Sequence, residues 1–317
     1  MPSAQDRLEL AARAAWLYYI AGRTQDEIAE QMDISRQAAQ RLVSLAVAEK
    51  LIKFRLDHPI AACMDLAEQL RERYGLALCE VVPRDPLSPD PLKGIAVAGA
   101  QFLERLLEQR APLVLGLSTG RTLRAVVAEV SPMETPQHKV FSMCGTMSAA
   151  GRASSLEPIT RLSERTGAQC FPMPTPVIAA SLDEKEVLES QRAVIHLREL
   201  AGEARALLVG ISQIGWMSPL HADGFISDSE LSELIEAGAV GEIAAHSFDA
   251  RGRTTRCGPE RRSTGLDITD YKAALRVAIG GSDAKVPAFR AALAGRRVNG
   301  IITDERTASS ILARTDA

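Results

Sequence analysis

Over residues 76–317, short aliphatic runs alternate with amphipathic helical segments. The aliphatic runs include PLVLG, ARALLVGIS, LRVAIGG and VNGIITD, and the helical patterns between them include LKGIAVAGAQFLERLLEQR and DEKEVLESQRAVIHLRELA. A strand followed by a helix, repeated along the chain, predicts an α/β fold with a largely parallel sheet and helices on both faces. Such sheets bind ligands in the loops beyond the carboxyl ends of their strands, so we expect a site there.

The chain has 317 residues, a length that favours two domains. Its 46% hydrophobic and 24% charged residues are typical of a soluble globular protein. The sequence contains no apolar run of the roughly 18 residues or more that indicates a membrane span. The charged start MPSAQDRLEL lacks the apolar core of a secretory signal. We therefore expect a cytoplasmic protein that does not enter the membrane.

The five cysteines and five histidines are dispersed, and none forms a metal-binding spacing such as CxxC or HExxH. We expect reduced thiols, no bound metal and no cofactor. The net charge of −3 is not that of a protein covered in basic residues for nucleic acid. A small DNA-binding module joined to a larger acidic domain would average to such a value, so local charge carries more information.

The N-terminal residues show helical spacing with two breaks. Gly22 is placed to end the first helix, and Thr24 with Glu27 forms a capping box that starts the second. Ser35 is placed to cap the third. The sequence thus predicts three helices, over about residues 5–20, 25–32 and 36–49.

Small residues lie where the second and third of these helices are expected to cross. Ala29 and Ala39 would let the two backbones approach closely at a steep angle, which predicts helix-turn-helix geometry. The apolar side chains that we expect to be buried are Ile28, Ala29 and Met32 on the second helix, and Ala39, Leu42, Val43, Ala46 and Val47 on the third.

Polar side chains gather on the outer face of the third helix. Arginine can form two parallel hydrogen bonds with guanine, and glutamine can do so with adenine. We therefore predict a DNA-binding surface formed by Thr24, Ser35, Arg36, Gln37, Gln40, Arg41 and Ser44, followed by a basic wing with Lys50, Lys53 and Arg55. The alternative is a helical hairpin that serves only for dimerisation or packing.

The predicted domain boundaries place the helix-turn-helix domain at residues 1–56, a linker helix at 57–75 and the α/β domain at 76–317. The helix expected after Pro59 has an apolar stripe that suits either packing on its own domain or an oligomer contact. The stripe consists of Ile60, Cys63, Met64, Ala67 and Leu70.

The loop GLSTGRTL follows the strand PLVLG and precedes a helix. Small residues, two hydroxyl groups and a helix N-terminus suit an anion such as phosphate. The loop lacks the patterns of a P-loop and of a dinucleotide fingerprint, and a capped turn without a ligand remains the alternative.

Other loops after predicted strands add candidate residues. They contain Gly145, Asp249 and Lys285, of which Lys285 would suit a phosphate and Asp249 a sugar hydroxyl. Each of these residues alone is weak evidence for a ligand site. Their shared position after predicted strands is what favours one.

Nearly the whole chain resembles the SorC/DeoR-type family of bacterial sugar-responsive transcriptional regulators. The resemblance is carried by the N-terminal segment, by LGLSTGRTL, by GAVGEIAAHSFDARG and by GGSDAKVPAFRAALAGRRVNGIITDERTA. It implies an N-terminal helix-turn-helix or winged-helix domain and an effector domain similar to sugar-phosphate isomerases. It also implies a tetramer built as a dimer of dimers.

The resemblance further implies which residues meet the effector, a phosphorylated sugar or polyol. They are Ser118, Thr119, Gly120, Arg121 and Thr122 for the phosphate, with Gly145, Asp249 and Lys285 lining the pocket. One departure is Cys144-Gly145, where relatives often have Asn-Gly, and the lost amide would alter which hydroxyls are recognised.

We therefore expect a regulator of a carbohydrate or polyol catabolic operon that binds operator DNA and is not an enzyme. One alternative is a sugar-phosphate isomerase with an accessory N-terminal domain, in which Asp249 or Glu242 would act as the base. Fold similarity alone does not exclude it, because a fold does not determine a function. A third reading is an adaptor whose N-terminal hairpin serves only for assembly.

Overall fold

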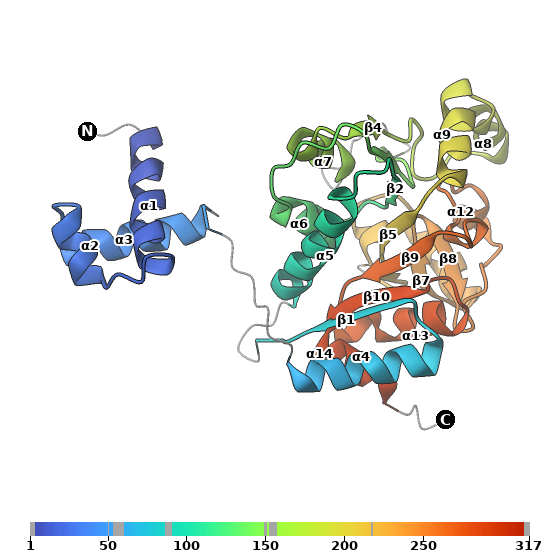
Figure 1. Cartoon of the computed structure of the whole chain (residues 1–317). Coiled ribbons are helices and arrows are strands. Elements are labelled where there is room, and N and C mark those ends of the chain that lie inside the picture. The colour runs from blue at the N-terminus through green and yellow to red at the C-terminus, as the bar shows by residue number, and fades with distance from the viewer. Residues whose placement is uncertain are drawn as a thin grey trace. The chain divides into compact units, whose positions relative to one another are not determined.

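The structure is a computed structural model that describes residues 4–49, 51–52, 60–85, 91–148, 151, 157–216 and 218–313 (Figure 1). The chain divides into two compact units, Met1–Pro59 and Ile60–Ala317. None of the helices within these described ranges has the length and apolar character needed to cross a membrane.

The first unit contains the three predicted helices, α1 (Ala4–Tyr19), α2 (Gln25–Gln31) and α3 (Arg36–Ala48). Thr24 and Glu27 form the predicted capping box, with the Thr24 N–H donating to Glu27 Oε2 at 2.8 Å. Ser35 caps α3 by accepting from the Ala38 N–H at 3.2 Å. These caps satisfy N–H groups that have no partner within their helices.

The turn between α2 and α3 is tight because Asp33 adopts a left-handed conformation with φ of 53°. Ala39 is fully buried and Ala29 is 9% exposed, and both belong to the same small core. The prediction that Val47 is buried was wrong, since 38% of its surface is exposed. Val47 lies one residue past the buried Ala46, which turns its side chain toward the solvent face.

The larger unit is built on seven strands, and all the pairings between them are parallel. In chain order the strands are β1 (Leu78–Val82), β2 (Val114–Leu117), β3 (Lys139–Ser142), β4 (Gln169–Phe171), β5 (Ala206–Gly210), β9 (Leu275–Ile279) and β10 (Gly300–Asp304). Their order across the sheet is β1-β10-β9-β5-β2-β3-β4. This confirms the predicted α/β class.

Helices cover both faces of this sheet (Figure 1). One face packs against α4 (Ala61–Tyr74), α9 (Arg192–Gly202), α13 (Val286–Ala294) and α14 (Glu305–Leu312). The other packs against α5 (Leu92–Leu107), α6 (Arg121–Glu129) and α7 (Ile159–Thr166). Successive residues of β5 alternate between the two cores, Ala206 and Leu208 in one and Leu207 and Val209 in the other, as the two-residue period of a strand requires.

The helix expected as a linker is α4, and three residues of its predicted stripe lie in the core of the larger unit. These are Cys63, Ala67 and Leu70, whereas Ile60 and Met64 are exposed. The helix thus belongs structurally to the unit that begins at Ile60.

A second sheet of three antiparallel strands, β6-β7-β8, adjoins the first. The sheet consists of β6 (Ser212–Gln213), β7 (Ala239–Ile243) and β8 (His246–Asp249). The other elements of this unit are α8 (Leu182–Glu189), α10 (Pro219–Ala222), α11 (Asp228–Glu236), α12 (Gly258–Arg261) and the 3-10 turns η1 (Ile268–Asp270) and η2 (Asp283–Lys285). The segment GEIAAHSFD folds as a hairpin of β7 and β8. Ala244 and Ala245, with φ of 51° and 67°, form its turn.

Candidate functional site

A cavity of about 320 Å³ lies at the carboxyl ends of β2, β5 and β9, between the two sheets. Six of the predicted effector-binding residues line it, namely Ser118, Thr119, Gly120, Arg121, Thr122 and Lys285. They come from segments more than 160 residues apart in sequence, as positions 122 and 285 show. Parallel strands bring such loops to one edge of a sheet.

The wall formed by the β2–α6 loop ends in the N-terminus of α6. Gly120 is the cap residue, with φ of 134°, and no side chain caps the helix. The first helical bond there runs from the Arg124 N–H to the Gly120 carbonyl at 3.0 Å. The preceding N–H groups of the first turn therefore have no intrahelical acceptor, and together with the helix dipole they favour an anion.

Ser118 has a different position from the rest of this loop. Its side chain is only 2% exposed, and its Oγ accepts a hydrogen bond from the Gly210 N–H at 3.0 Å. Because Gly210 ends β5, this bond ties the end of β2 to its neighbour. Thr119, by contrast, has its Oγ1 3.5 Å from the Sγ of Cys144, which also lines the cavity.

Lys285 reaches the cavity from the loop that follows β9. A Cβ atom built on Gly280 would lie 3.8 Å from Lys285 Nζ and 3.9 Å from Thr122 Oγ1, so both polar groups face the same small volume. Burial lowers the pKa of Lys285, which the negative charge of Glu242 opposes and the positive charge of Arg121 reinforces. An anion bound here would favour the charged amine.

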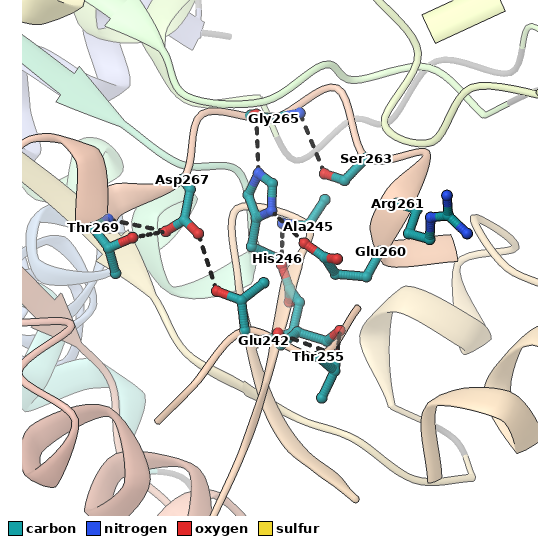
Figure 2. Close-up of polar contacts among 12 residues, drawn as sticks. Glu242, Ala245, His246, Thr255, Glu260, Arg261, Ser263, Gly265, Asp267 and Thr269 are labelled. Carbon is teal, nitrogen blue, oxygen red and sulfur yellow. Dashed lines mark hydrogen bonds and ion pairs between the residues drawn. The ribbon is translucent and has the colours of Figure 1, made fainter. Parts of the chain in front are cut away.

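The small sheet supplies polar groups to the remaining wall. Glu242 and Gln213 line the cavity, and the buried Oε1 of Gln213 has no hydrogen-bond partner in the described part of the chain. The Ala245 N–H donates to the Glu242 carboxylate (Figure 2). Burial raises the pKa of Glu242, although that hydrogen bond and the charge of His246 act in the opposite direction.

Behind the hairpin turn lies a buried polar cluster (Figure 2). The Nδ1 of His246 is 3.1 Å from Glu260 Oε1, and its Nε2 is 3.0 Å from the Gly265 carbonyl oxygen. Both ring nitrogens thus face acceptors, which favours the doubly protonated ring. Burial alone would lower the pKa of His246, but the Glu260 hydrogen bond and the charge of Asp267 outweigh it and raise the pKa.

An ion pair lines the cavity at the α6 end. The Nη2 of Arg121 lies 3.0 Å from Oδ1 of Asp223, which follows α10, and both residues line the cavity. No group of three or more His, Cys, Asp or Glu side chains suited to a metal ion occurs in the part of the chain that the structure describes.

Two of the predicted effector residues do not line the cavity. Gly145 packs so tightly that a Cβ there would lie 1.9 Å from the Thr175 carbonyl oxygen, so a glycine is required by backbone contact. Asp249 ends β8, and its Oδ2 accepts from Nη2 of Arg253 at 2.7 Å. Its Oδ1 accepts from the N–H groups of Arg251 and Arg253.

Several cavity residues lie outside the set that the sequence predicts to bind a ligand. They are Ser212, Gln213, Asp223, Phe225, Glu242 and Ser282, of which Glu242 was considered only as an enzymatic base. Most come from the short β6 strand and the irregular segment around α10, which carry no periodic pattern. The available signal for Ser212 and Gln213 was their position at the carboxyl end of the predicted run ARALLVGIS, which Ser212 ends and Gln213 follows.

The seven residues predicted to bind DNA are all exposed in the first unit. Thr24 and Ser35 act as helix caps, and Arg36 lies in the first turn of α3 with its Nε 3.5 Å from Asp26 Oδ1. The wing residues Lys50, Lys53 and Arg55 lie outside the described residues.

Comparison with known proteins identifies the family. Residues 58–313 match the Sugar-bind family of sugar-binding domains. The erythritol catabolism regulatory protein EryD of Brucella abortus is 33% identical over 305 residues, which cover 96% of this chain and 96% of that protein. The deoxyribonucleoside regulator of Bacillus subtilis is 26% identical over 315 residues, which cover 97% of this chain and 98% of that protein.

The chain belongs to the SorC/DeoR-type family of sugar-binding regulators. As a SorC/DeoR-type protein it is a transcriptional regulator, and the isomerase alternative is disfavoured. The full-length sorbitol operon regulator SorC from Klebsiella pneumoniae has the same fold, with a TM-score of 0.75 over 96% of this chain and 99% of that one at 21% identity.

Proposed function

We propose that this SorC/DeoR-type regulator binds operator DNA through α3 and controls a carbohydrate or polyol catabolic operon. Its effector would be a phosphorylated sugar or polyol held in the cavity between the two sheets. The observation that carries this proposal is the meeting of the uncapped α6 N-terminus with Lys285 in one small volume.

The α6 end of the cavity has the chemistry of a phosphate site. Main-chain N–H groups of the first helical turn and the hydroxyls of Thr119 and Thr122 can donate to phosphate oxygens. Lys285 and Arg121 add positive charge at the same place. Because the walls are partly buried, these charge-assisted hydrogen bonds are stronger than they would be in open water.

The opposite wall suits hydroxyl groups. The Oε1 of Gln213 accepts no hydrogen bond from any residue that the structure describes, and Glu242 presents further acceptor positions on the same wall. A buried acceptor without a partner costs free energy, which a ligand hydroxyl would recover. A short polyhydroxylated chain with one terminal phosphate therefore fits the distribution of charges and acceptors.

We further propose that the ligand is bound and not converted. Asp249 is one of the two carboxylates considered as a base for an isomerase. It does not line the cavity, and its Oδ2 accepts hydrogen bonds from the guanidinium group of Arg253. The other, Glu242, already accepts the Ala245 N–H. Turnover of sugar phosphates by the purified protein would contradict this part of the proposal.

The assembly that we propose is a homotetramer in the cytoplasm. Effector binding would shift the population between two tetramer arrangements that present their α3 helices at different spacings. Such a protein should bind palindromic DNA with strong salt dependence.

The testing experiment is a thermal-shift screen of the full chain. Because a regulator of erythritol catabolism is 33% identical to this chain, the panel begins with erythritol and its phosphates and continues with pentose and hexose phosphates. A ligand at about a hundredfold its Kd should add roughly 2.7 kcal/mol of apparent stability.

Two variants and one control make the screen specific. Thr119→Ala and Lys285→Ala should lose the stabilisation, whereas replacing the exposed Lys93 by Ala should keep it. The phosphate site is rejected if only free polyols stabilise the protein, or if no compound in the panel does.

A further inference from the structure

The wall of the cavity next to α6 is formed by a segment between two glycines. Gly215 and Gly224 have positive φ values of 154° and 76°, and α10 lies between them. We call residues 215–216 and 218–224 the α10 segment. Within it Pro219, Leu220 and Asp223 line the cavity. The two glycines give this segment backbone freedom at both ends.

The α10 segment is joined to the phosphate loop by one charged contact. Arg121 is the first residue of α6, and its Nη2 lies 3.0 Å from Asp223 Oδ1. The carboxylate of Asp223 thus pairs with the charged side chain of Arg121 at the N-terminus of α6. A bound phosphate would require the same cation, so the two anions compete for Arg121.

Two polar atoms in the same segment are incompletely satisfied. The Oγ of Ser218 and the Nδ1 of His221 are buried and have no hydrogen-bond partner among the residues that the structure describes. Buried polar groups normally have partners, because each unsatisfied group costs about 1–3 kcal/mol. An arrangement of the segment that gave these two atoms partners would recover this free energy.

We propose that Asp223 is an internal competitor of the effector phosphate, and that its ion pair with Arg121 latches the α10 segment in the ligand-free state. This inference rests on the proposed phosphate site and adds its regulation. A dianionic phosphate displaces Asp223 and releases the segment, whereas a neutral polyol leaves the latch closed. The ion pair thereby makes the response depend on the phosphate and not only on the hydroxyl pattern.

The first test measures binding of inorganic phosphate by the full chain with calorimetry. Asp223→Asn removes the competing charge and preserves the side-chain shape, so phosphate should bind about two- to fivefold more tightly, as expected for a partly exposed ion pair. Asp223→Ser repeats the measurement with a smaller side chain, in case the amide disturbs folding.

A double variant separates the latch from simple charge repulsion. If Asp223 acts through Arg121, the gain from Asp223→Asn disappears when Arg121 is replaced by Gln. If Asp223 only repels the phosphate, the gain is the same in both backgrounds, and the latch is wrong.

A fluorescence measurement reports on the segment itself. The chain has two tryptophans, Trp16 and Trp216, so Trp16→Phe leaves Trp216 as the only tryptophan. Trp216 is 61% exposed, and its ring meets the His221 ring edge-on, with the two ring centroids 5.4 Å apart. Phosphate should change its emission, and Asp223→Asn should shift the ligand-free spectrum toward the phosphate-bound one.

The outcomes distinguish the two proposals. If wild-type protein binds phosphate but Asp223→Asn binds it equally or more weakly, the latch is refuted and the phosphate site stands. If neither the wild type nor any variant binds phosphate, the phosphate site fails and the latch fails with it. An emission spectrum of Trp216 that responds to neither phosphate nor Asp223→Asn also refutes the latch.

Discussion

The hydroxyl of Ser118 accepts a hydrogen bond from the main-chain N–H of Gly210 at 3.0 Å, joining the ends of two neighbouring parallel strands. A residue expected to bind the ligand therefore also holds together the edge on which the ligand site is built. The same group cannot be removed to test binding without a cost to the fold.

Ser118→Ala should lower the free energy of unfolding by about 1–3 kcal/mol in the absence of any ligand, because it leaves the Gly210 N–H without its acceptor. Urea denaturation measures this loss. Thr119→Ala is the matched control. Within the described structure the hydroxyl of Thr119 has a hydrogen bond only with the Cys144 thiol, so the free energy of unfolding of this variant should be nearly unchanged. Equal stability of wild type and Ser118→Ala would contradict the structural role.

Gly145→Ala should be severely destabilising, because the new Cβ would lie 1.9 Å from the Thr175 carbonyl oxygen and the two backbones would have to separate. We expect loss of folded protein or a drop in unfolding free energy of several kcal/mol, followed by circular dichroism during thermal denaturation. Gly202→Ala, at a position with open space around it, serves as the control. A stable Gly145→Ala protein that had lost only ligand binding would show that this glycine acts through the ligand.

Phosphate affinity should fall as pH rises through the lowered pKa of Lys285. Burial disfavours the charged amine in the free protein, and a bound phosphate favours it, so binding is accompanied by proton uptake. Calorimetry in buffers of different ionisation enthalpy measures this uptake. Lys285→Arg keeps the charge at all accessible pH values, so its affinity should lose this part of the pH dependence. A wild-type profile as flat as that of the arginine variant would exclude Lys285 from the site.

The buried His246 should make stability depend on pH. Its folded pKa lies above its ordinary value of 6.5, so the stabilisation is fully present below about pH 6.5 and is lost as pH rises through the folded pKa. His246→Gln should remove this slope in urea denaturation series above pH 6.5. Glu242, whose pKa is also raised, contributes a loss of the same sign, so Glu242→Gln must be measured in parallel. An unchanged slope in His246→Gln would assign the effect to Glu242.

Arg36→Ala or Arg41→Ala should weaken operator binding by about 1–3 kcal/mol if the side chain contacts a base. The ion pair of Arg36 with Asp26 is exposed, so its removal should cost at most about 1 kcal/mol of stability and cannot explain a large loss by unfolding. Fluorescence anisotropy with an operator fragment measures the affinity. Glu30→Ala, on the exposed face of α2, controls for general surface changes. DNA affinity that survives both arginine changes would favour the adaptor interpretation.

The sequence predicted the parallel α/β class and the three N-terminal helices with their caps, because aliphatic runs, helical periodicity and capping residues are local signals. It did not predict the turn at Ala244 and Ala245, since a left-handed alanine pair is imposed by tertiary contacts and lacks the usual Gly or Asn. The sequence also did not predict that Asp223 lines the cavity, because Asp223 lies in an irregular segment without a periodic pattern. Asp249 was placed by position after a strand, but that strand belongs to the small antiparallel sheet, whose far end lies away from the cavity lining.

The cavity has walls of two kinds. The proposed phosphate end combines main-chain N–H groups at the start of α6 with the side chains of Thr119 and Lys285, whereas the proposed hydroxyl end depends on side chains of the small sheet such as Gln213 and Glu242. A change of sugar preference can therefore be engineered on β6 and β7 without rebuilding the anion site. On this proposal, substitutions on the three-stranded sheet would change the metabolite to which the regulator responds.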